Sequence, residues 1–366
     1  MQTPSLTVLR YPGQVPPFVE AALERLYGSL YSSLAHLRTY GGLDGASTYA
    51  AWRGDTLVSV LLFRQRGPEI QVINEGIRLQ SDEMEAFAHH IFGNIKSARR
   101  IHFHAVMAEP PPTLLPTLRF DCTEDIVVTL PGSVEDYLAR LGKSTRKNIR
   151  QNLSRAQRTL PGFRHEVQAG SAVSPQVIMD IIGFNHARMA GKSRVSALDH
   201  QASENLIALI RERGVVGLTK TDDRLCGGTL ACRIGQDMYS LVNAHDPAYD
   251  AFGMGTLCCY LMMMASIHAH DQRFHLMGGQ FGAKQMFLGE RLPQVHLVRY
   301  RSHLDLARHA GGVARLALRA ALYRTRSWLA DQPHLRHQTR VSRTVTRVLP
   351  PLRQMVRGLK ARTTVN

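Results

Sequence analysis

Two glycine-containing segments in the second half of the chain carry residue types that group-transfer chemistry uses. The first, Phe252-Gly253-Met254-Gly255-Thr256, follows a strand expected at residues 238–243 and opens an apolar helix expected at 255–268. Backbone N–H groups at such a helix start are available donors, and the positive end of the helix dipole suits a pyrophosphate. We therefore predict that Gly253, Met254, Gly255 and Thr256 bind a phosphate-bearing cofactor.

The second segment, residues 278–287, reads Gly-Gly-Gln-Phe-Gly-Ala-Lys-Gln-Met-Phe and follows a strand expected at 274–277. Its glycines allow a backbone to approach a ligand closely, so Gly279 and Gln280 are candidates for substrate binding. Lys284 lies in an apolar stretch, where a lysine is either a surface residue with a buried stem or a fixed positive charge. We favour the fixed charge and predict a catalytic role for Lys284.

Just before the first segment, the strand at 238–243 ends in Ala244-His245-Asp246-Pro247-Ala248-Tyr249. An acceptor amine or hydroxyl must lose a proton, and His245 and Asp246 are placed where a general base can act. The alternative is that Asp246-Pro247 is an ordinary start of a turn. Tyr249 is a further candidate for substrate binding.

The elements that position these segments occur twice. Residues 48–73 and 216–242 each read as strand, polar turn, long apolar strand, turn and third strand. Their turns align as Arg66-Gly67-Pro68 with Gly235-Gln236-Asp237, residue types that suit hairpins. Helical patterns precede each copy, at 15–37 and at 175–189 and 199–213, and a helix and a strand follow each. The sequence predicts two copies of one α+β unit.

Two predicted helices add polar side chains to the second copy. Residues 142–158 form a helix with Ile149 and Leu153 on one side and a strongly basic face that includes Arg146. Arginine rows suit phosphate-bearing ligands, although a merely solvated face is the alternative. Near the end of the helix at 175–189, His186 and Arg188 are candidates for acceptor binding, the alternative for His186 being a structural helix histidine.

Charge is concentrated at the C-terminus. Of the net charge of +16, residues 302–366 carry +11, with 12 Arg and one Lys against Asp305 and Asp331. This segment reads as basic amphipathic helices, which either pack on the body of the protein or lie on an anionic membrane or another polyanion. Five cysteines without a C-x-x-C motif favour reduced core thiols and a cytoplasmic protein, and no metal site is predicted. We also expect no signal peptide at the N-terminus.

The segment from about 137 to 287 resembles the CelD/BcsL-like acetyltransferases, a GNAT branch related to the Fem-type peptidyltransferases. The resemblance rests on the basic helix, on Phe184-Asn185-His186-Ala187-Arg188, on Phe252-Gly253-Met254-Gly255, and on Gly279 with Lys284 and Phe287. Met254 replaces the proline usual in the family, Ala283 a tyrosine and His275 an aspartate. The resemblance implies a GNAT fold, an acetyl-CoA or other acyl-CoA donor, and no metal.

These observations predict tandem GNAT-like α+β units with a basic helical tail. The expected division is a degenerate unit at 1–130, a catalytic unit at 131–301 and the tail at 302–366. The resemblance implies an N- or O-acyltransferase that acts on a sugar, polysaccharide or cell-envelope precursor, at the inner face of the plasma membrane if the tail binds lipid. The alternatives are a Fem-like ligase that uses aminoacyl-tRNA and a non-enzymatic membrane-docked scaffold.

Overall fold

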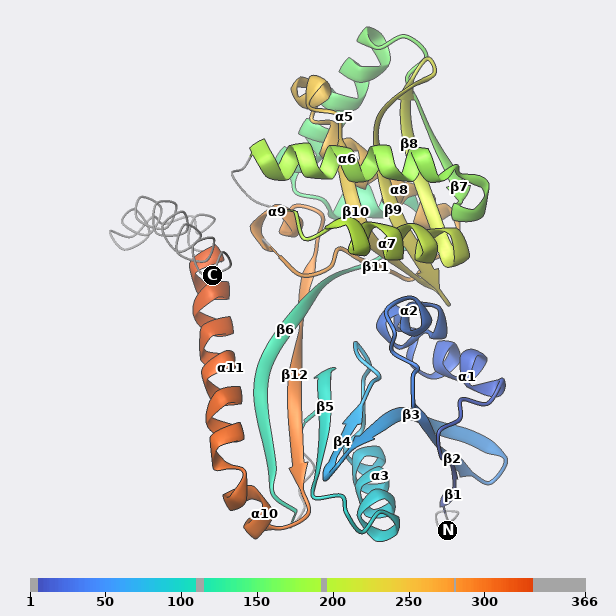
Figure 1. The fold of residues 1–366 in the computed structure, drawn as a ribbon. Coiled ribbons are helices and arrows are strands. Elements are labelled where there is room, and N and C mark those ends of the chain that lie inside the picture. Colours follow the sequence, from blue (N-terminus) through green and yellow to red (C-terminus); the bar gives the residue numbers. More distant parts are fainter. Residues whose placement is uncertain (1–5, 110–114, 192–195, 280, 332–366) are drawn as a thin grey trace, which may run out of the picture.

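The computed structural model describes residues 6–109, 115–191, 196–279 and 281–331 (Figure 1). The strands are β1 (Leu6–Tyr11), β2 (Ser47–Arg53), β3 (Thr56–Arg66), β4 (Glu69–Val72), β5 (Arg100–Val106), β6 (Thr117–Thr129), β7 (Arg164–Ala169), β8 (Gly214–Thr221), β9 (Arg224–Ile234), β10 (Asp237–His245), β11 (Arg273–His275) and β12 (Glu290–Tyr300). The helices are α1 (Phe18–Tyr27), α2 (Leu34–Thr39), α3 (Ser81–Asn94), α4 (Val134–Arg140), α5 (Lys143–Thr159), α6 (Pro175–Gly191), α7 (His200–Arg213), α8 (Met254–His268), α9 (Phe281–Gln285), α10 (His303–Arg308) and α11 (Ala310–Asp331). Short 3-10 turns are η1 (Leu30–Ser32), η2 (Gly170–Ala172) and η3 (Pro247–Phe252).

Twelve strands of the described residues form one sheet in the order β1-β2-β3-β4-β5-β12-β6-β11-β10-β9-β8-β7. At one end β2, β3 and β4 are an antiparallel meander, and β4 pairs in parallel with β5 after helix α3. At the other end β8, β9 and β10 repeat the meander, and β10 pairs in parallel with β11 after helix α8. The prediction of tandem GNAT-like α+β units is confirmed.

The hairpin turns of the two copies correspond, one residue away from the predicted alignment. The turn between β3 and β4 begins at Gly67 and the turn between β9 and β10 begins at Gly235, with φ of 56° and 58°. Glycine adopts this left-handed conformation without the steric cost of a Cβ. Gly67 therefore matches Gly235 rather than the following glutamine.

The two copies are joined through β6 and β12, which run side by side between them (Figure 1). β6 has 13 residues; its last part pairs with β11 of the second copy, while β12 pairs along most of β6 and also with β5 of the first copy. β12 thus belongs by sequence to the predicted unit 131–301 and pairs with a strand of the predicted unit 1–130. The division at residues 130 and 301 remains a proposal.

Helices cover both faces of the sheet. In the first copy α3 packs over a core that includes Phe63, Phe87 and Phe103, and α1 and α2 cover the opposite face. In the second copy α4, α5 and α8 cover one face, and α6 and α7 cover the other. Leu30 and Ala35 of the first copy are part of the core beneath α6 and α7, so the two copies share apolar surface as well as strands.

Candidate active site

The two parallel strands of the second copy separate shortly after they pair. β10 and β11 are aligned over three residue pairs, of which Tyr239 and His275 form the last. Beyond them Leu276 donates its N–H to Ile126 O of β6 (2.7 Å), whereas β10 continues to His245 alongside β9 and contains an irregularity between Ser240 and Val242. The edge of β10 that faces β11 has no strand partner from Ser240 onward in the described part of the chain. Backbone donors and acceptors of β10 are therefore available to a ligand here.

The glycine turn lies where β10 leads into α8. Gly253 has φ of 62°, and a Cβ built on it would lie 2.4 Å from Nδ2 of Asn152 on α5. The conformation therefore favours glycine, and a larger residue would also have to displace the Asn152 side chain. Thr256 and Leu257 donate their N–H groups to Gly253 O at 2.9 and 3.1 Å. The remaining N–H groups of the first turn, those of Met254 and Gly255, are the donors that this helix start can offer.

Three of the four predicted cofactor-binding residues are accessible at this turn. Gly253, Gly255 and Thr256 are half-buried, and Asn243 Nδ2 donates to Gly255 O (2.8 Å), which fixes the turn to β10. The Met254 side chain is fully buried in the core beneath α8. Met254 can therefore take part through its backbone only.

The two residues predicted as a general base, His245 and Asp246, have different partners in the structure. His245 Nε2 lies 2.7 Å from Asp250 Oδ1, and its ring packs near Gly255. Asp246 accepts the Ala248 N–H (2.9 Å), as the N-cap of η3, and pairs with Arg224 (3.0 Å). Both oxygens of Asp246 thus have structural partners, as expected for the turn alternative.

Tyr249 is buried beside these residues, and the Arg224 guanidinium lies over its ring, 5.8 Å from the ring centroid. The contact is a cation–π interaction that ties η3 to β9.

The ammonium group of Lys284 forms hydrogen bonds with backbone carbonyl groups. Its Nζ donates to the carbonyl oxygens of Leu276, Met277 and Gly278 at 2.5, 2.6 and 2.8 Å. An ammonium has three donors, so all of them are engaged. Burial lowers the pKa of Lys284 to about 8. The interaction holds the segment in which the chain turns away from β11, where Met277 and Gly279 have φ of 64° and 128°.

The other predicted substrate-binding residues are dispersed. Arg188 donates to Asn185 Oδ1 (2.8 Å), and its charge lowers the pKa of Lys284, which places it near the same segment. His186 is exposed on α6. Arg146 donates to Leu138 O (3.3 Å) in the preceding helix. Gly279 lies beside Lys284, and Gln280 is outside the described residues.

A cavity of about 330 Å³ lies between the two copies on the face of the sheet opposite α8. Strands of both copies and the segment around η1 contribute to its walls. The lining residues are Leu26, Tyr27, Ser29, Tyr31, Gly76, Arg78, Met107, Asp125, Val127, Thr129, Tyr239, Arg273, His275, Glu290, Leu292 and Gln294. Tyr239 and His275, the last pair before β10 and β11 separate, are thus also part of the cavity wall.

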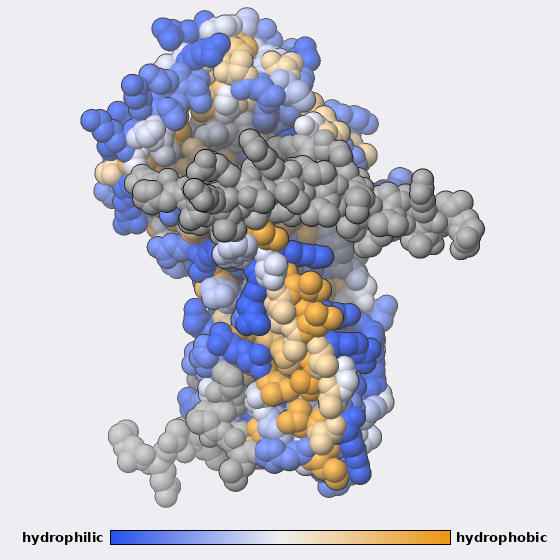
Figure 2. All heavy atoms as spheres, turned by 90° about the vertical axis from the view of Figure 1, so that its left-hand side faces the viewer, coloured by the Kyte–Doolittle hydropathy of each residue, from blue (hydrophilic) through white to orange (hydrophobic). Residues whose placement is uncertain are grey.

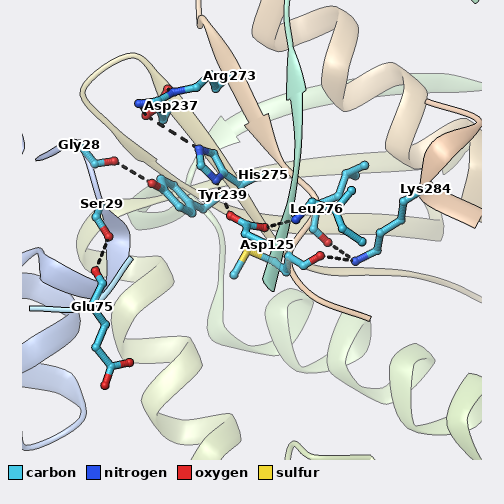
Figure 3. A network of polar contacts seen from close by, with 12 residues as sticks. Gly28, Ser29, Glu75, Asp125, Asp237, Tyr239, Arg273, His275, Leu276 and Lys284 are labelled. Carbon is cyan, nitrogen blue, oxygen red and sulfur yellow. Dashed lines mark hydrogen bonds and ion pairs between the residues drawn. The ribbon is translucent and has the colours of Figure 1, made fainter. Parts of the chain in front are cut away.

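His275 is the centre of a polar network in this wall (Figure 3). Its ring stacks on Tyr239 with centroids 4.0 Å apart, and its Nδ1 lies 2.6 Å from Asp125 Oδ2 of β6. The other ring nitrogen, Nε2, is buried 3.9 Å from Asp237 Oδ2 and has no hydrogen-bond partner among the described residues. Asp237 in turn forms a two-pronged ion pair with Arg273 at 2.8 and 2.5 Å.

The carboxylates determine how His275 titrates. Burial disfavours the charged imidazolium, but the hydrogen bond to Asp125 and the charge of Asp237 outweigh burial and raise the pKa of His275 above its ordinary value of 6.5. Asp237 is held in the opposite direction: burial opposes ionisation, yet His275 and Arg273 lower its pKa. A histidine held between two carboxylates has the chemistry that proton transfer requires.

The first wall of the cavity is built by the N-terminal copy. Ser29 and Ser32 donate to Glu75 O at 2.8 and 2.9 Å, and the Tyr239 hydroxyl donates to Gly28 O (2.7 Å). Gly76 has φ of 65°, and a Cβ there would lie 2.7 Å from Ser29 Oγ. The serine contacts fix the loop around η1 within the first copy, and the hydrogen bond from Tyr239 to Gly28 joins that loop to the second copy.

Comparison with known proteins decides the family of the second copy. Residues 143–285 match the family model described as acetyltransferase (GNAT) domain. The chain contains a GNAT domain. It is an acyltransferase. The GNAT domain spans α5 to α9, so β6 with Asp125 and β12 lie outside the matched segment.

Solved structures with the same arrangement cover most of the chain. The crystal structure of FemX aligns with a TM-score of 0.59 at 11% identity, over 82% of this chain and 99% of FemX. A conserved protein of unknown function from Bacteroides thetaiotaomicron VPI-5482 aligns with a TM-score of 0.50 at 12% identity, over 80% of this chain and all of that protein. At these identities the likeness shows the fold alone. No curated protein matches the chain in sequence.

His275 and Asp125 were not among the predicted site residues. His275 entered the prediction only as a departure from the aspartate usual in the resembling family, and no role was predicted for Asp125. The available signal was a single carboxylate at the start of an otherwise apolar run, Asp125-Ile126-Val127-Val128. A buried carboxylate needs a partner, and here that partner is 150 residues away.

Proposed function

We propose that the chain transfers an acyl group from acyl-CoA to an amine or hydroxyl of a sugar-like or cell-envelope acceptor. The observation that carries the proposal is the position of the Tyr239–His275 pair, at which β10 and β11 separate and which also lines the cavity. A donor thioester between the separated strands and an acceptor in the cavity then meet at this pair.

The separated strands suit the parts of coenzyme A. The unpaired edge of β10 after Ser240 can pair with the amides of the pantetheine arm, and its N–H groups can stabilise an oxyanion on the thioester carbonyl. The helix start at Gly253–Gly255 suits the pyrophosphate. Helix α5 packs against this turn, with Arg155 donating to Ala251 O (3.0 Å). Its exposed Lys143, Lys147 and Arg150 add positive charge nearby.

The chemistry proposed at the pair is direct transfer. The acceptor nitrogen or oxygen attacks the thioester carbonyl carbon, and His275 Nε2 takes the acceptor proton, directly or through one water. The tetrahedral intermediate then expels the thiolate of CoA, which is protonated in turn. Because Nε2 is buried, a neighbour must move to admit the acceptor, and the Arg273 side chain, 47% exposed, is able to do so.

Two predicted catalytic roles are modified in this proposal. Lys284, with its three donors on backbone carbonyls, positions the segment after β11 instead of acting as a catalytic residue. His245 remains the competing candidate for the base, since it lies at the end of β10 and is partly exposed. Both carboxylate oxygens of Asp246 are engaged, one by Arg224 and one by the Ala248 N–H of η3, and Asp246 is no longer proposed as the base.

The lining of the cavity supports the proposed acceptor class. Hydroxyl, carboxylate, amide and guanidinium groups line the cavity together with aromatic rings, and such polar groups can fix the orientation of an acceptor that has several hydroxyl groups. The narrower CelD/BcsL-like resemblance, with its envelope acceptor, is part of the same proposal, as is a place at the inner face of the plasma membrane.

The melting temperature of the protein with and without a panel of acyl-CoA thioesters tests the donor. A ligand that binds only the folded state raises the melting temperature, so we expect a rise with at least one thioester and no rise with pantetheine alone. Release of free CoA thiol over a panel of amines, amino sugars and polyols then identifies the acceptor. If aminoacyl-tRNA stabilises the protein and no thioester does, the Fem-like ligase replaces this proposal. If neither ligand stabilises the protein, the non-enzymatic scaffold becomes the favoured function.

A further inference from the structure

Helix α11 packs along β6 through one side only. Val313, Leu316 and Tyr323 are half-buried, and Ala320 is buried, on the side that faces β6. Near the C-terminal end of the helix, Arg324 lies 3.7 Å from Asp121 of β6. These contacts fix the helix on the sheet and thereby determine which side chains face outward.

The opposite side of α11 is apolar as well. Leu318 is 61% exposed, Leu322 49% and Trp328 51%, and Leu304 of the adjoining α10 is 58% exposed. Figure 2 shows apolar residues forming a continuous stripe along this face of the molecule. Helices of proteins that stay in water usually carry polar residues on the side away from the core. An exposed apolar stripe of this length indicates a surface that contacts something else.

Arginines border the stripe. Arg308, Arg315, Arg319 and Arg326 follow one edge at helical spacing, Arg324 lies on the other, and all are exposed. From Leu306 to Ala330 the sequence contains five arginines and no aspartate, glutamate or lysine. An apolar face with a cationic border has the composition of a helix that lies in the interface of an anionic membrane.

We propose that α11 docks the protein on an anionic lipid surface, with Leu318, Leu322 and Trp328 among the acyl chains and the bordering arginines at the headgroup phosphates. The charge pattern favours lipid over a second copy of the chain. Two copies that met through this stripe would bring their arginine rows together, and like charges oppose such contact. No helix in the part of the chain that the structure describes is long and apolar enough to cross a membrane.

Co-sedimentation of the full chain with vesicles tests this proposal. Vesicles of phosphatidylcholine alone are compared with vesicles that also contain phosphatidylglycerol. We expect binding to the anionic vesicles only, and an at least tenfold weaker binding both for Leu318→Ser with Leu322→Ser and for Arg315→Gln with Arg326→Gln. The matched controls, Leu9→Ser with Met179→Ser and Arg66→Gln with Arg211→Gln, change exposed residues elsewhere and should bind as the parent does.

Fluorescence separates insertion from simple charge attraction. The chain has two tryptophans, so Trp52→Phe leaves Trp328 as the reporter. We expect its emission to shift to shorter wavelength with anionic vesicles. Absence of vesicle binding, equal binding to neutral vesicles, equal losses in the controls, or binding without an emission shift would each overturn the proposal. So would a dimer in light scattering that Leu318→Ser with Leu322→Ser dissociates, because a second copy would then cover the stripe.

Discussion

Replacing Gly255 with aspartate is expected to lower the affinity for acyl-CoA by about a thousandfold. The proposed pyrophosphate lies at the start of α8, and a carboxylate at residue 255 would stand beside it. Two like charges about 4 Å apart repel by about 4 kcal/mol at the effective dielectric of a protein surface, which is about a thousandfold in affinity. The rise in melting temperature with a thioester, measured over a range of concentrations, reports the change.

Two further glycine variants distinguish the effect of the added charge from the effect of the added side-chain volume. A Cβ at Gly255 would lie 3.0 and 3.1 Å from the His245 ring, which a small rotation of that side chain can relieve. Gly255→Ala should therefore keep most of the affinity. Gly183→Asp adds the same charge on an exposed part of α6 with open space and should keep all of it. An unchanged thioester response in Gly255→Asp would remove the donor from this turn.

Replacing His275 with glutamine is expected to lower kcat/KM by about a hundredfold to ten-thousandfold, the range that a general base contributes. The thioester should still raise the melting temperature, because the donor turn is intact. The rate of the parent protein should increase with pH through the pKa of His275, since the neutral ring accepts the proton, and this pKa is raised above 6.5 by Asp125 and Asp237 against the effect of burial. In His275→Gln this increase should vanish.

Asp237→Asn tests the predicted pH dependence of the rate in a second way. It removes a charge that raises the pKa of His275, so the midpoint of the rate profile should move to lower pH. The free energy of unfolding of the parent should also depend on pH. Because the pKa of His275 is raised in the folded protein, its stabilising contribution is fully present below the unfolded pKa and is lost as pH rises through the folded pKa. His245→Gln is the comparison, because a larger loss there than in His275→Gln would make His245 the base.

The repeated unit was predictable because its signals are local. Hairpin turns are set by a few neighbouring residues, and Gly67 and Gly235 mark the same turn in both copies. The alignment was wrong by one residue because several turn-forming residues stand together and only the backbone shows which has positive φ. The start of α4 was predictable for the same reason, since Ser133 accepts the Asp136 N–H (3.1 Å) as its N-cap.

The junction between the copies was not predictable from local pattern. β12 contains Pro293 and charged residues at both ends, so its sequence does not resemble an internal strand, yet it lies between β5 and β6. Proline removes a ladder hydrogen bond and is usual at irregular positions, and the register of β12 with β6 shifts at the next residue, Gln294. Pairing over such a sequence separation depends on the whole fold.

The candidate site was predictable in part. The glycine turn follows from the order of strand, turn and apolar helix, and it lies where that order places it. The partners of Lys284 could not be inferred, because a lysine in an apolar stretch gives no sign of whether it meets a ligand or backbone carbonyls. The His275–Asp125 pair joins strands that are adjacent only in the folded chain. The inner and outer apolar sides of α11 are likewise distinguished only by its contact with β6.

The crystal structure of the protein with bound CoA tests the central claim most directly, namely that donor and acceptor meet at the Tyr239–His275 pair. We expect the pyrophosphate at Gly253–Gly255, the pantetheine arm along β10 after Ser240, and the sulfur between the separated strands on the way to the cavity that His275 lines. CoA bound elsewhere, or a sulfur directed away from this cavity, would contradict it.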